Sequence, residues 1–436
     1  MGRRFTLLVI SMLLGALGWA QENLSLANCI EYALANHPEV RVAQLSMKDA
    51  DWQIRENRSI AYPQLTLGIN AQRYLIQPAL PAEALGFGEP GQKIKFALKN
   101  NIAGSLGISQ LMYNSSYIAS IKGAKMYRDY INLQLNAVKE KVRNRVTDAY
   151  LPALVVTESI EVLDKNIENQ ERMFRETKAT YAAGFIEQLD VDRVEYVLST
   201  LRTERESLAR QKEIVIDALK FAMGKSIGDE ITLSDDIDRL LVMYGDIDPE
   251  ASLDYMNRPE YVTLLKAREL SQVQVEVYQK DWLPTLSFFG SYNPSFQGNE
   301  KLFWIPSSII GLQLNMPIYD GGMSRAKEER AVIAAMKVDE QKKMLTQAYD
   351  TQVEAARKQY NNAKLKLTDL EHNLALAQRI HETSEAKFKQ GVGSSFEVTQ
   401  ALMGYFQAQG MYIKARYDYL NSIIGLRQAL GITSNE

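Results

Sequence analysis

The stretch YAAGFIEQLDV, at residues 181–191, has a counterpart in FKQGVGSSFEV, at residues 388–398, 207 positions later. Each stretch places a glycine, Gly184 or Gly391, at the end of a long helical pattern, and glycine readily adopts the left-handed conformation that closes a helix. An acidic residue, Asp190 or Glu397, follows six positions later. There the dipole of a new helix favours negative charge in its first turn. We therefore predict two helical hairpins, each turning at its glycine.

Sequence landmarks outside these stretches recur at a similar interval. HPEV at residues 37–40 recurs as RPEY at residues 258–261, 221 positions later, and Pro63 recurs as Pro284 at the same interval. The interval then falls to 207, so one loop is shorter in the second copy. An internal repeat sets the domain plan. We expect a signal peptide at 1–20, a first repeat at 21–224, a connector at 225–252, a second repeat at 253–431 and a tail at 432–436.

Each repeat is expected to contain the same elements in the same order. These are an opening helix (24–57 and 253–280), a strand pair (62–113 and 284–317), a long helix (114–183 and 320–390) and a return helix (186–223 and 394–430). Each long helix would measure about 105 Å, more than the diameter of a small domain. Apolar residues recur along it every three or four positions, which is typical of a coiled coil. We expect Pro152 to bend the first long helix, because proline removes a backbone hydrogen bond.

The predicted strands show strict alternation of side chains. Leu65, Leu67 and Ile69 alternate with small or polar residues, and the other three strands repeat this pattern, with loops at 74–101 and 293–306 between the strands of each pair. A length of about nine to eleven residues is what a tilted strand needs to cross a bilayer. The alternation fits a soluble half-buried sheet and a membrane sheet equally well. Hydrocarbon does not tolerate an open sheet edge, so a membrane barrel would need several copies of the chain.

The composition excludes several functional classes. Lys and Arg total 50 against 53 Asp and Glu, a formal net charge of −3, so nucleic acid is not an expected partner. The single cysteine, Cys29, provides neither a disulfide framework nor a cysteine metal cluster. We expect Cys29 to be a buried thiol on a helix.

Few residues are available for catalysis or metal binding. His372 and His381 are nine positions apart on one helix, not the four that a metal-binding pair prefers, and His37 precedes a proline at a predicted helix end. The acidic residues at 235, 236 and 238 fit a solvated turn better than a calcium loop, which needs further spaced ligands. We therefore expect no enzymatic activity, no cofactor and no metal site.

The N-terminus has the features of a secretory signal. Arg3 and Arg4 precede an apolar stretch at residues 5–17 and small residues that end at Ala20. An uncleaved anchor helix is the alternative, but about 13 apolar residues are too few to span a bilayer. We predict that the chain is exported and cleaved after Ala20.

The sequence resembles the TolC family of outer-membrane efflux proteins over nearly the whole mature chain. LSLANCIEYAL at residues 24–34, followed by NHPE at residues 36–39, is similar to the family's N-terminal signature, and the two glycine turns are similar to its periplasmic tips. The duplicated order of helix, strand pair, long helix, turn and return helix is more specific than any single motif.

This resemblance implies a mainly α fold with a small β part. Three chains would pool four strands each into a transmembrane β-barrel of about twelve strands, continued by a long antiparallel coiled-coil tunnel in the periplasm. The protein would be a passive exit duct of a tripartite efflux or type I secretion system in the outer membrane of a Gram-negative bacterium. Its partners would be a periplasmic adaptor (membrane fusion) protein, an inner-membrane pump of the RND or ABC type, and outer-membrane lipid.

The resemblance also implies which residues act. The residues that would contact the adaptor are Ala183, Gly184, Phe185, Gln390, Gly391 and Val392. The residues that would line the periplasmic aperture are Glu397, Gln400 and Asp190. Gln400 replaces an acidic residue, so a double ring of carboxylates is not expected. Gly393 replaces a basic residue that can pair with the position of Asp190, so another latch, or a looser closed state, is implied. Aromatic side chains gather at membrane interfaces, where we expect Tyr62, Trp282 and Trp304.

An exported soluble coiled-coil or adhesion protein with a small sheet is the main alternative. It would carry the same helices and strands without forming a channel. Recovery in the periplasmic fraction without detergent would support it.

Overall fold

The computed structural model describes residues 22–86, 89, 91–245 and 247–432. The predicted signal peptide at 1–20, and all but the first residue of the predicted tail at 432–436, lie outside these ranges. The chain divides into two compact units. Unit 1 contains the residues up to Leu45, Leu133–Thr263 and those from Lys342 onward; unit 2 contains Ser46–Asn132 and Leu264–Gln341.

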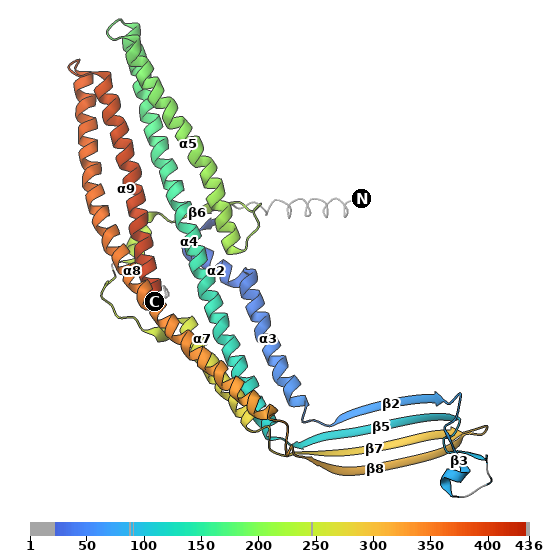
Figure 1. Cartoon of the computed structure of the whole chain (residues 1–436). Helices are drawn as coiled ribbons and strands as arrows, with labels where there is room; N and C mark the ends of the chain where they lie inside the picture. The colour runs from blue at the N-terminus through green and yellow to red at the C-terminus, as the bar shows by residue number, and fades with distance from the viewer. Residues whose placement is uncertain (1–21, 87–88, 90, 246, 433–436) are drawn as a thin grey trace, which may run out of the picture. The chain divides into compact units, whose positions relative to one another are not determined.

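Unit 2 contains a four-stranded antiparallel sheet in the order β2-β5-β7-β8 (Figure 1). The strands are β2 at Gln64–Arg73, β5 at Asn100–Tyr113, β7 at Thr285–Gly298 and β8 at Phe303–Asn315. Three of them have 13 or 14 residues and are longer than expected. β2 and β8 form the two edges, and within the described residues neither has a second partner strand.

The expected loop at residues 293–306 is wrong. β7 and β8 stay paired as far as Gln297 and Phe303, which leaves only residues 299–302 as the connection. Pro294 and Pro306 lie inside the expected loop, and proline cannot donate to a strand ladder. The two prolines are register partners, so both missing donors fall at one position and the ladder continues beyond them.

The expected loop at residues 74–101 contains short elements of its own. β3 at Ala79–Pro81 pairs with β4 at Lys93–Lys95, and the 3-10 turn η1 at Ala82–Leu85 follows β3. These elements lie at one end of the sheet (Figure 1).

Four helices contribute to unit 2. They are α3 at Pro38–Ser59, α4 at Ser115–Ala182, α7 at Pro259–Gln279 and α8 at Met323–Lys389. Small residues allow close approach: a Cβ added at Gly123 of α4 would lie 3.3 Å from Cγ1 of Val273 in α7. The Arg128–Asp51 ion pair (2.6 Å) joins α4 to α3. Because both side chains are well exposed to solvent, this pair adds little to stability.

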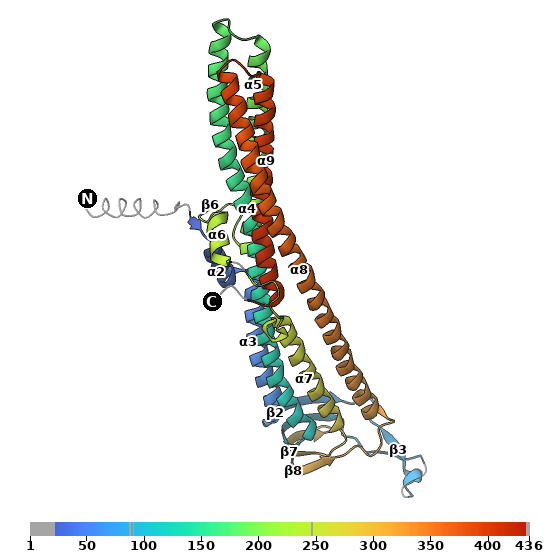
Figure 2. The same ribbon diagram turned by 90° about the vertical axis from the view of Figure 1, so that its left-hand side faces the viewer.

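Unit 1 contains two antiparallel helical hairpins. Hairpin 1 consists of α4 and α5 (Gln188–Met223), and hairpin 2 of α8 and α9 (Ser395–Leu430). The turns contain Gly184 and Gly391, with φ of 81° and 76°, and both lie at the same end of the unit (Figure 2). α4 continues through Pro152. Within the described ranges, no helix combines the length and the apolar composition of a membrane-spanning helix.

The main core of unit 1 lies toward the ends of α5 and α9 that are remote from the turns. α2 (Leu26–Asn36) and α6 (Ile237–Tyr244) pack there, and β1 (Glu22–Leu24) pairs in parallel with β6 (Ile231–Leu233). Cys29 is completely buried on α2, as predicted, and burial raises the pKa of its thiol to about 12. The thiol therefore stays protonated and unreactive at neutral pH.

Two local expectations near this core have different outcomes. The opening helix is two helices, because α2 ends at Asn36 and α3 begins at Pro38; His37 caps α2, which confirms it as a helix-end residue. The solvated acidic turn is wrong for Asp235 only, because Asp236 and Asp238 are exposed. Oδ2 of Asp235 accepts hydrogen bonds from the Leu26 N–H (2.7 Å) and from the hydroxyl of the buried Tyr150 (3.0 Å). These two bonds join the loop after β6, which contains Asp235, to α2 and α4.

The second repeat opens with a short 3-10 turn before its helix. This turn, η2, covers Tyr255–Asn257, and α7 begins at Pro259. Arg258, between them, donates to the carbonyls of Gln428 (2.6 Å) and Ala429 (3.1 Å) at the end of α9. Carbonyls in the last turn of a helix lack intrahelical partners, and the guanidinium of Arg258 satisfies two of them.

Candidate functional site

The two turns at the end of unit 1 have nearly the same geometry. We call residues 183–185 the first tip and residues 390–392 the second tip. The N–H of Phe185 donates to the Thr180 carbonyl (3.2 Å), and the N–H of Val392 donates to the Lys387 carbonyl (3.1 Å). All six residues predicted to contact an adaptor are exposed, and the Phe185 side chain is 82% exposed. The tips therefore present apolar side chains on rigid helix ends.

Asp190 joins the two hairpins directly behind the tips. Its Oδ1 accepts a hydrogen bond from the hydroxyl of Ser395, a buried residue of α9, and lies 3.8 Å from Nη1 of Arg193. Arg193 Nη1 also donates to Ser395 Oγ (3.1 Å), and its guanidinium lies 5.5 Å from the ring centre of Phe396. We call Asp190, Arg193, Ser395 and Phe396 the tip cluster. The cluster joins α5 to α9 at this end of the hairpins.

Glu397 and Gln400 lie on α9, immediately beyond the tip cluster. They are one helical turn apart, so they share a face, and both are exposed. The N–H of Glu397 donates to Ser394 Oγ (3.2 Å), the N-cap of α9. Within the described chain, no group of three His, Cys, Asp or Glu side chains is placed to hold a metal ion.

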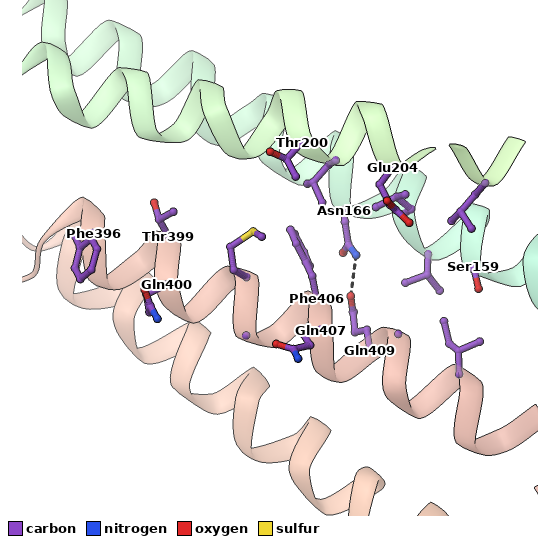
Figure 3. A pocket seen from close by; sticks show the side chains of 18 residues that line it. Ser159, Asn166, Thr200, Glu204, Phe396, Thr399, Gln400, Phe406, Gln407 and Gln409 are labelled. Carbon is purple, nitrogen blue, oxygen red and sulfur yellow. Dashed lines mark hydrogen bonds between the residues drawn. The ribbon is translucent and has the colours of Figure 1, made fainter. Parts of the chain in front are cut away.

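A hollow of about 740 Å³ separates hairpin 1 from α9 next to Gln400. Figure 3 shows α4 and α5 on one side of it and α9 on the other. Leu163, Leu201 and Phe406 belong to the apolar cluster along its wall. Asn166 Nδ2 of α4 donates to Gln409 Oε1 of α9 across it (2.7 Å) (Figure 3). The hairpins are therefore loosely packed here and joined by a small apolar cluster and by the Asn166–Gln409 hydrogen bond.

A buried ion cluster joins the hairpins on the side of the hollow away from the tips. The Arg416 side chain of α9 is 9% exposed and pairs with Glu158 of α4 and with Asp238 of α6 (2.5 Å for the latter). Burial disfavours the charged guanidinium, but the two carboxylates outweigh burial and raise the pKa of Arg416. Asp238, expected to be solvated, is 77% exposed and at the same time takes part in this interhelical contact.

His381 packs inside the hairpin region rather than in a ligand set. Its ring stacks on Tyr405 of α9, with 5.7 Å between ring centres, and Nε2 lies 4.0 Å from a Glu385 oxygen. Burial lowers the pKa of His381. His372 is exposed on the same helix. The geometry places these two histidines in separate environments.

The predicted interface aromatics lie at both ends of the sheet. Tyr62 and Trp282 precede β2 and β7, whose first residues are at the same end of the antiparallel sheet. Trp304 lies at the other end, where it packs on Phe296 of β7 with 4.8 Å between ring centres. All three predicted residues are exposed.

Sequence reasoning missed the partners that join the hairpins. Asp190 was expected at the aperture, but Ser395 and Arg193 were not connected to it, and the Arg416 cluster was not foreseen. These contacts depend on how the helices align with one another, because Asp190 and Ser395 are 205 positions apart in sequence and Glu158 and Arg416 are 258 positions apart. No local pattern indicates that alignment, and Arg416, with Lys414 and Asp418 two positions away on either side, carries no sequence signal of burial.

Comparisons with known proteins agree with this architecture. The family model described as outer membrane efflux protein matches residues 29–225 and 256–432. The chain is 23% identical to the outer membrane protein TolC of Vibrio cholerae, over 98% of this chain and 95% of that protein. It is 22% identical to the pyoverdine export outer membrane protein OpmQ of Pseudomonas aeruginosa, over 74% of this chain and 67% of that protein.

Solved structures show the same fold. The CmeC outer membrane channel of Campylobacter jejuni aligns with a TM-score of 0.74 at 17% identity, over 97% of this chain and 92% of that chain. The outer membrane protein VceC of Vibrio cholerae aligns with a TM-score of 0.71 at 15% identity, over 93% of this chain and 96% of that chain.

Proposed function

Because the chain belongs to the outer membrane efflux protein family, we propose that it is the outer-membrane exit duct of a multicomponent export system. It is a protein of the Gram-negative outer membrane with a large periplasmic part. In this proposal the duct is passive: an inner-membrane pump of the RND or ABC type supplies the energy, and a periplasmic adaptor connects pump and duct. No catalytic residue or cofactor is required.

The observation that carries the proposal is the sheet of unit 2. Leu65, Ile108, Gly290 and Ile310 are register partners across all four strands, so they share one face. On the edge strands the apolar side chains of this face are largely exposed; Leu65, Leu67 and Ile69 are 72–75% exposed. In the next row, Thr66, Gly107 and Ser291 suit a water-filled interior, and the β8 member of the row is the apolar Ile309.

The two open edges of the sheet require further strands. Unpaired N–H and C=O groups cost several kcal/mol each in hydrocarbon, so a lipid-facing sheet has to close. The edge strands β2 and β8 run antiparallel to each other in a four-stranded antiparallel sheet, so β8 of one copy can extend the same pattern with β2 of the next. Three copies then give a barrel of about twelve strands, within the range of outer-membrane barrels.

In the proposed duct, the hairpins form the periplasmic tunnel and its entrance. The exposed tips would contact the adaptor, and Glu397 and Gln400 would line the aperture with Asp190 beside them. Opening would break the tip cluster and the Asn166–Gln409 hydrogen bond, because both cross between hairpins 1 and 2. The Arg416 cluster would remain as the fixed end of that movement, since the buried guanidinium of Arg416 is paired with both Glu158 and Asp238.

Single-channel recording in planar bilayers tests the proposal. The unaltered protein should form conducting channels, and Glu397→Lys should change conductance and reduce cation preference, because it reverses a charge at the proposed constriction. Glu250→Lys reverses a charge in the exposed connector and should leave both unchanged. Absence of channels would contradict the duct, and an unaffected Glu397→Lys channel would contradict the placement of the aperture.

A further inference from the structure

The end of the sheet remote from Tyr62 and Trp282 forms a second surface. We call residues 73–86, 89, 91–101 and 298–303, which lie at this end, the apex. Asn299 joins its two parts: Oδ1 accepts hydrogen bonds from the Lys99 N–H (3.0 Å) and from Gln77 Nε2 (2.9 Å). Asn100 Nδ2 donates to the Asn299 carbonyl (3.0 Å). These bonds join segments about 200 residues apart, so the apex is one surface.

The apex has a positive charge in a chain that is negative overall. It contains five basic residues, Arg73, Lys93, Lys95, Lys99 and Lys301, against three acidic ones. Lys93 and Lys95 are two positions apart on β4, so they project to the same side of the β3–β4 hairpin. In the described part of the chain, none of the five basic side chains is paired with a carboxylate. One acidic side chain, Glu83, is engaged by the Gly91 N–H (2.7 Å).

Apolar side chains project from the apex between these charges. Leu75 and Ile76 are 91% and 90% exposed, and Phe96, next to Lys95, is 62% exposed. Exposed apolar area costs roughly 25 cal/mol per Å² relative to burial. A patch that combines apolar and basic side chains is typical of surfaces that lie in the headgroup layer of a membrane.

We propose that the apex binds the phosphate-bearing headgroups of the lipid leaflet at this end of the barrel. The proposal rests on the membrane barrel proposed above. Leu75, Ile76 and Phe96 would enter the boundary of the acyl chains, and the lysine stems would follow the apolar surface while their ammonium groups reach phosphates. The adjacent Phe296–Trp304 pair marks the aromatic level expected at such an interface.

A lipid phosphate fits these observations better than a free phosphate ion. A site for a free anion would gather its donors around one point. Here Lys93 and Lys95 lie on β4, whereas Lys99 and Lys301 lie on two other segments, and the exposed Phe96 lies between Lys95 and Lys99 in the sequence. Flexible ammonium groups of this kind act as point charges against a charged layer. Each lysine near an anionic membrane surface contributes about fivefold in affinity.

Binding of lipid A to the purified full-length protein in detergent tests the proposal. The probes are diphosphorylated lipid A and the same lipid without its phosphates, titrated and counted by native mass spectrometry. The variant is Lys93→Gln/Lys95→Gln/Lys99→Gln/Lys301→Gln. The matched control is Lys48→Gln/Lys125→Gln/Lys337→Gln/Lys358→Gln, which removes four exposed helical lysines. Both are also recorded in planar bilayers.

We expect the apex variant to bind diphosphorylated lipid A at least tenfold more weakly than the unaltered protein. The control variant should bind it as the unaltered protein does, and the conductance of both variants should be unchanged. The lipid without phosphates should bind the unaltered protein as weakly as lipid A binds the apex variant. If the apex and control variants both conduct ions and bind lipid A equally well, the apex proposal alone is overturned. Full displacement of lipid A by millimolar inorganic phosphate would overturn it as well. Failure of the unaltered protein to form channels would instead overturn the duct, and this inference with it.

Discussion

Asp190 and Ser395 are 205 residues apart in sequence, and their hydrogen bond joins α5 to α9 behind the tips. A hydrogen bond to a charged group contributes about 1.5–3 kcal/mol. Ser395→Ala should therefore shift the closed entrance toward the open state and raise the frequency of channel openings about tenfold or more. Single-channel recording at fixed voltage measures this frequency.

Ser394→Ala is the matched control for that substitution. Ser394 is the N-cap of α9 and accepts from the Glu397 N–H, but it makes no bond to hairpin 1 in the described structure. Its loss should weaken the helix end by about 1 kcal/mol without a comparable change in opening. Equal effects of the two variants would show that helix fraying, and not the tip cluster, controls the entrance.

His381 makes the stability of the hairpin region depend on pH. Burial lowers its pKa below the ordinary value of 6.5, so the unfolded chain binds a proton at a higher pH than the folded one does. Stability is then complete above about pH 6.5 and falls as the pH drops through the lowered pKa of the folded state. Glu382 and Glu385 oppose the lowering of the pKa, and Lys389 supports it. Arg172 and Glu176 of α4 line a second hollow together with His381.

His381→Phe should keep the stacking on Tyr405 and remove this titration. The apparent Tm in detergent should then decrease less between pH 7.5 and pH 5 than it does in the unaltered protein. His372→Phe changes an exposed histidine and should leave the pH dependence as it was. A decrease of the same size in all three proteins would contradict the assignment to His381.

At the scale of elements, the Arg416 cluster joins α4, α6 and α9. Arg416→Met leaves the partly buried Glu158 without its cation. Removing one partner of a buried ion pair lowers the free energy of unfolding by about 3–5 kcal/mol. We expect a clear decrease in the apparent Tm. Combining it with Glu158→Leu should recover most of the loss, since both charges are then absent.

The Lys366–Asp418 pair provides the comparison for that measurement. Its side chains are 48% and 31% exposed, and such pairs contribute no more than about 1 kcal/mol. Lys366→Met should therefore change the Tm little. A loss as large as that of Arg416→Met would show that burial of the Arg416 cluster is not the cause.

Two adjacent residues of β2 test which face of the sheet meets lipid. Leu67→Lys puts a charge on the apolar face of β2 and should cost about 2–4 kcal/mol if this face meets the middle of the bilayer. Thr66→Lys puts the charge on the opposite face and should be tolerated. The measurement is the yield of heat-modifiable oligomer in outer-membrane fractions; equal yields would contradict the lipid-facing assignment.

The sequence predicted the elements better than their ends and contacts. Periodicity located all four strands and both hairpins, because side-chain alternation and glycine turns are local signals. The β7–β8 connection was misplaced because Pro294 and Pro306, which usually mark turns, pair with each other inside the ladder. The β1–β6 pair was missed because three residues carry too little alternation to be recognised.

Contacts in the candidate site were less predictable than the elements that carry them. The positions of Gly184, Gly391 and Asp190 followed from the repeat. The bonding of Asp190 to Ser395, and of Asp235 to Leu26 and Tyr150, depends on how distant helices and loops align. That alignment is decided by packing of the whole unit, which no short stretch of sequence encodes.

At the scale of the whole molecule, the account depends on assembly. A single chain has an antiparallel sheet with an exposed apolar face and two open edges, an arrangement that neither water nor hydrocarbon favours. Closure by identical copies satisfies both the edges and the apolar face. Native mass spectrometry of the protein extracted from outer membranes with detergent measures the number of copies. We predict a complex of three chains; a folded single chain that stays in solution without detergent would contradict the account.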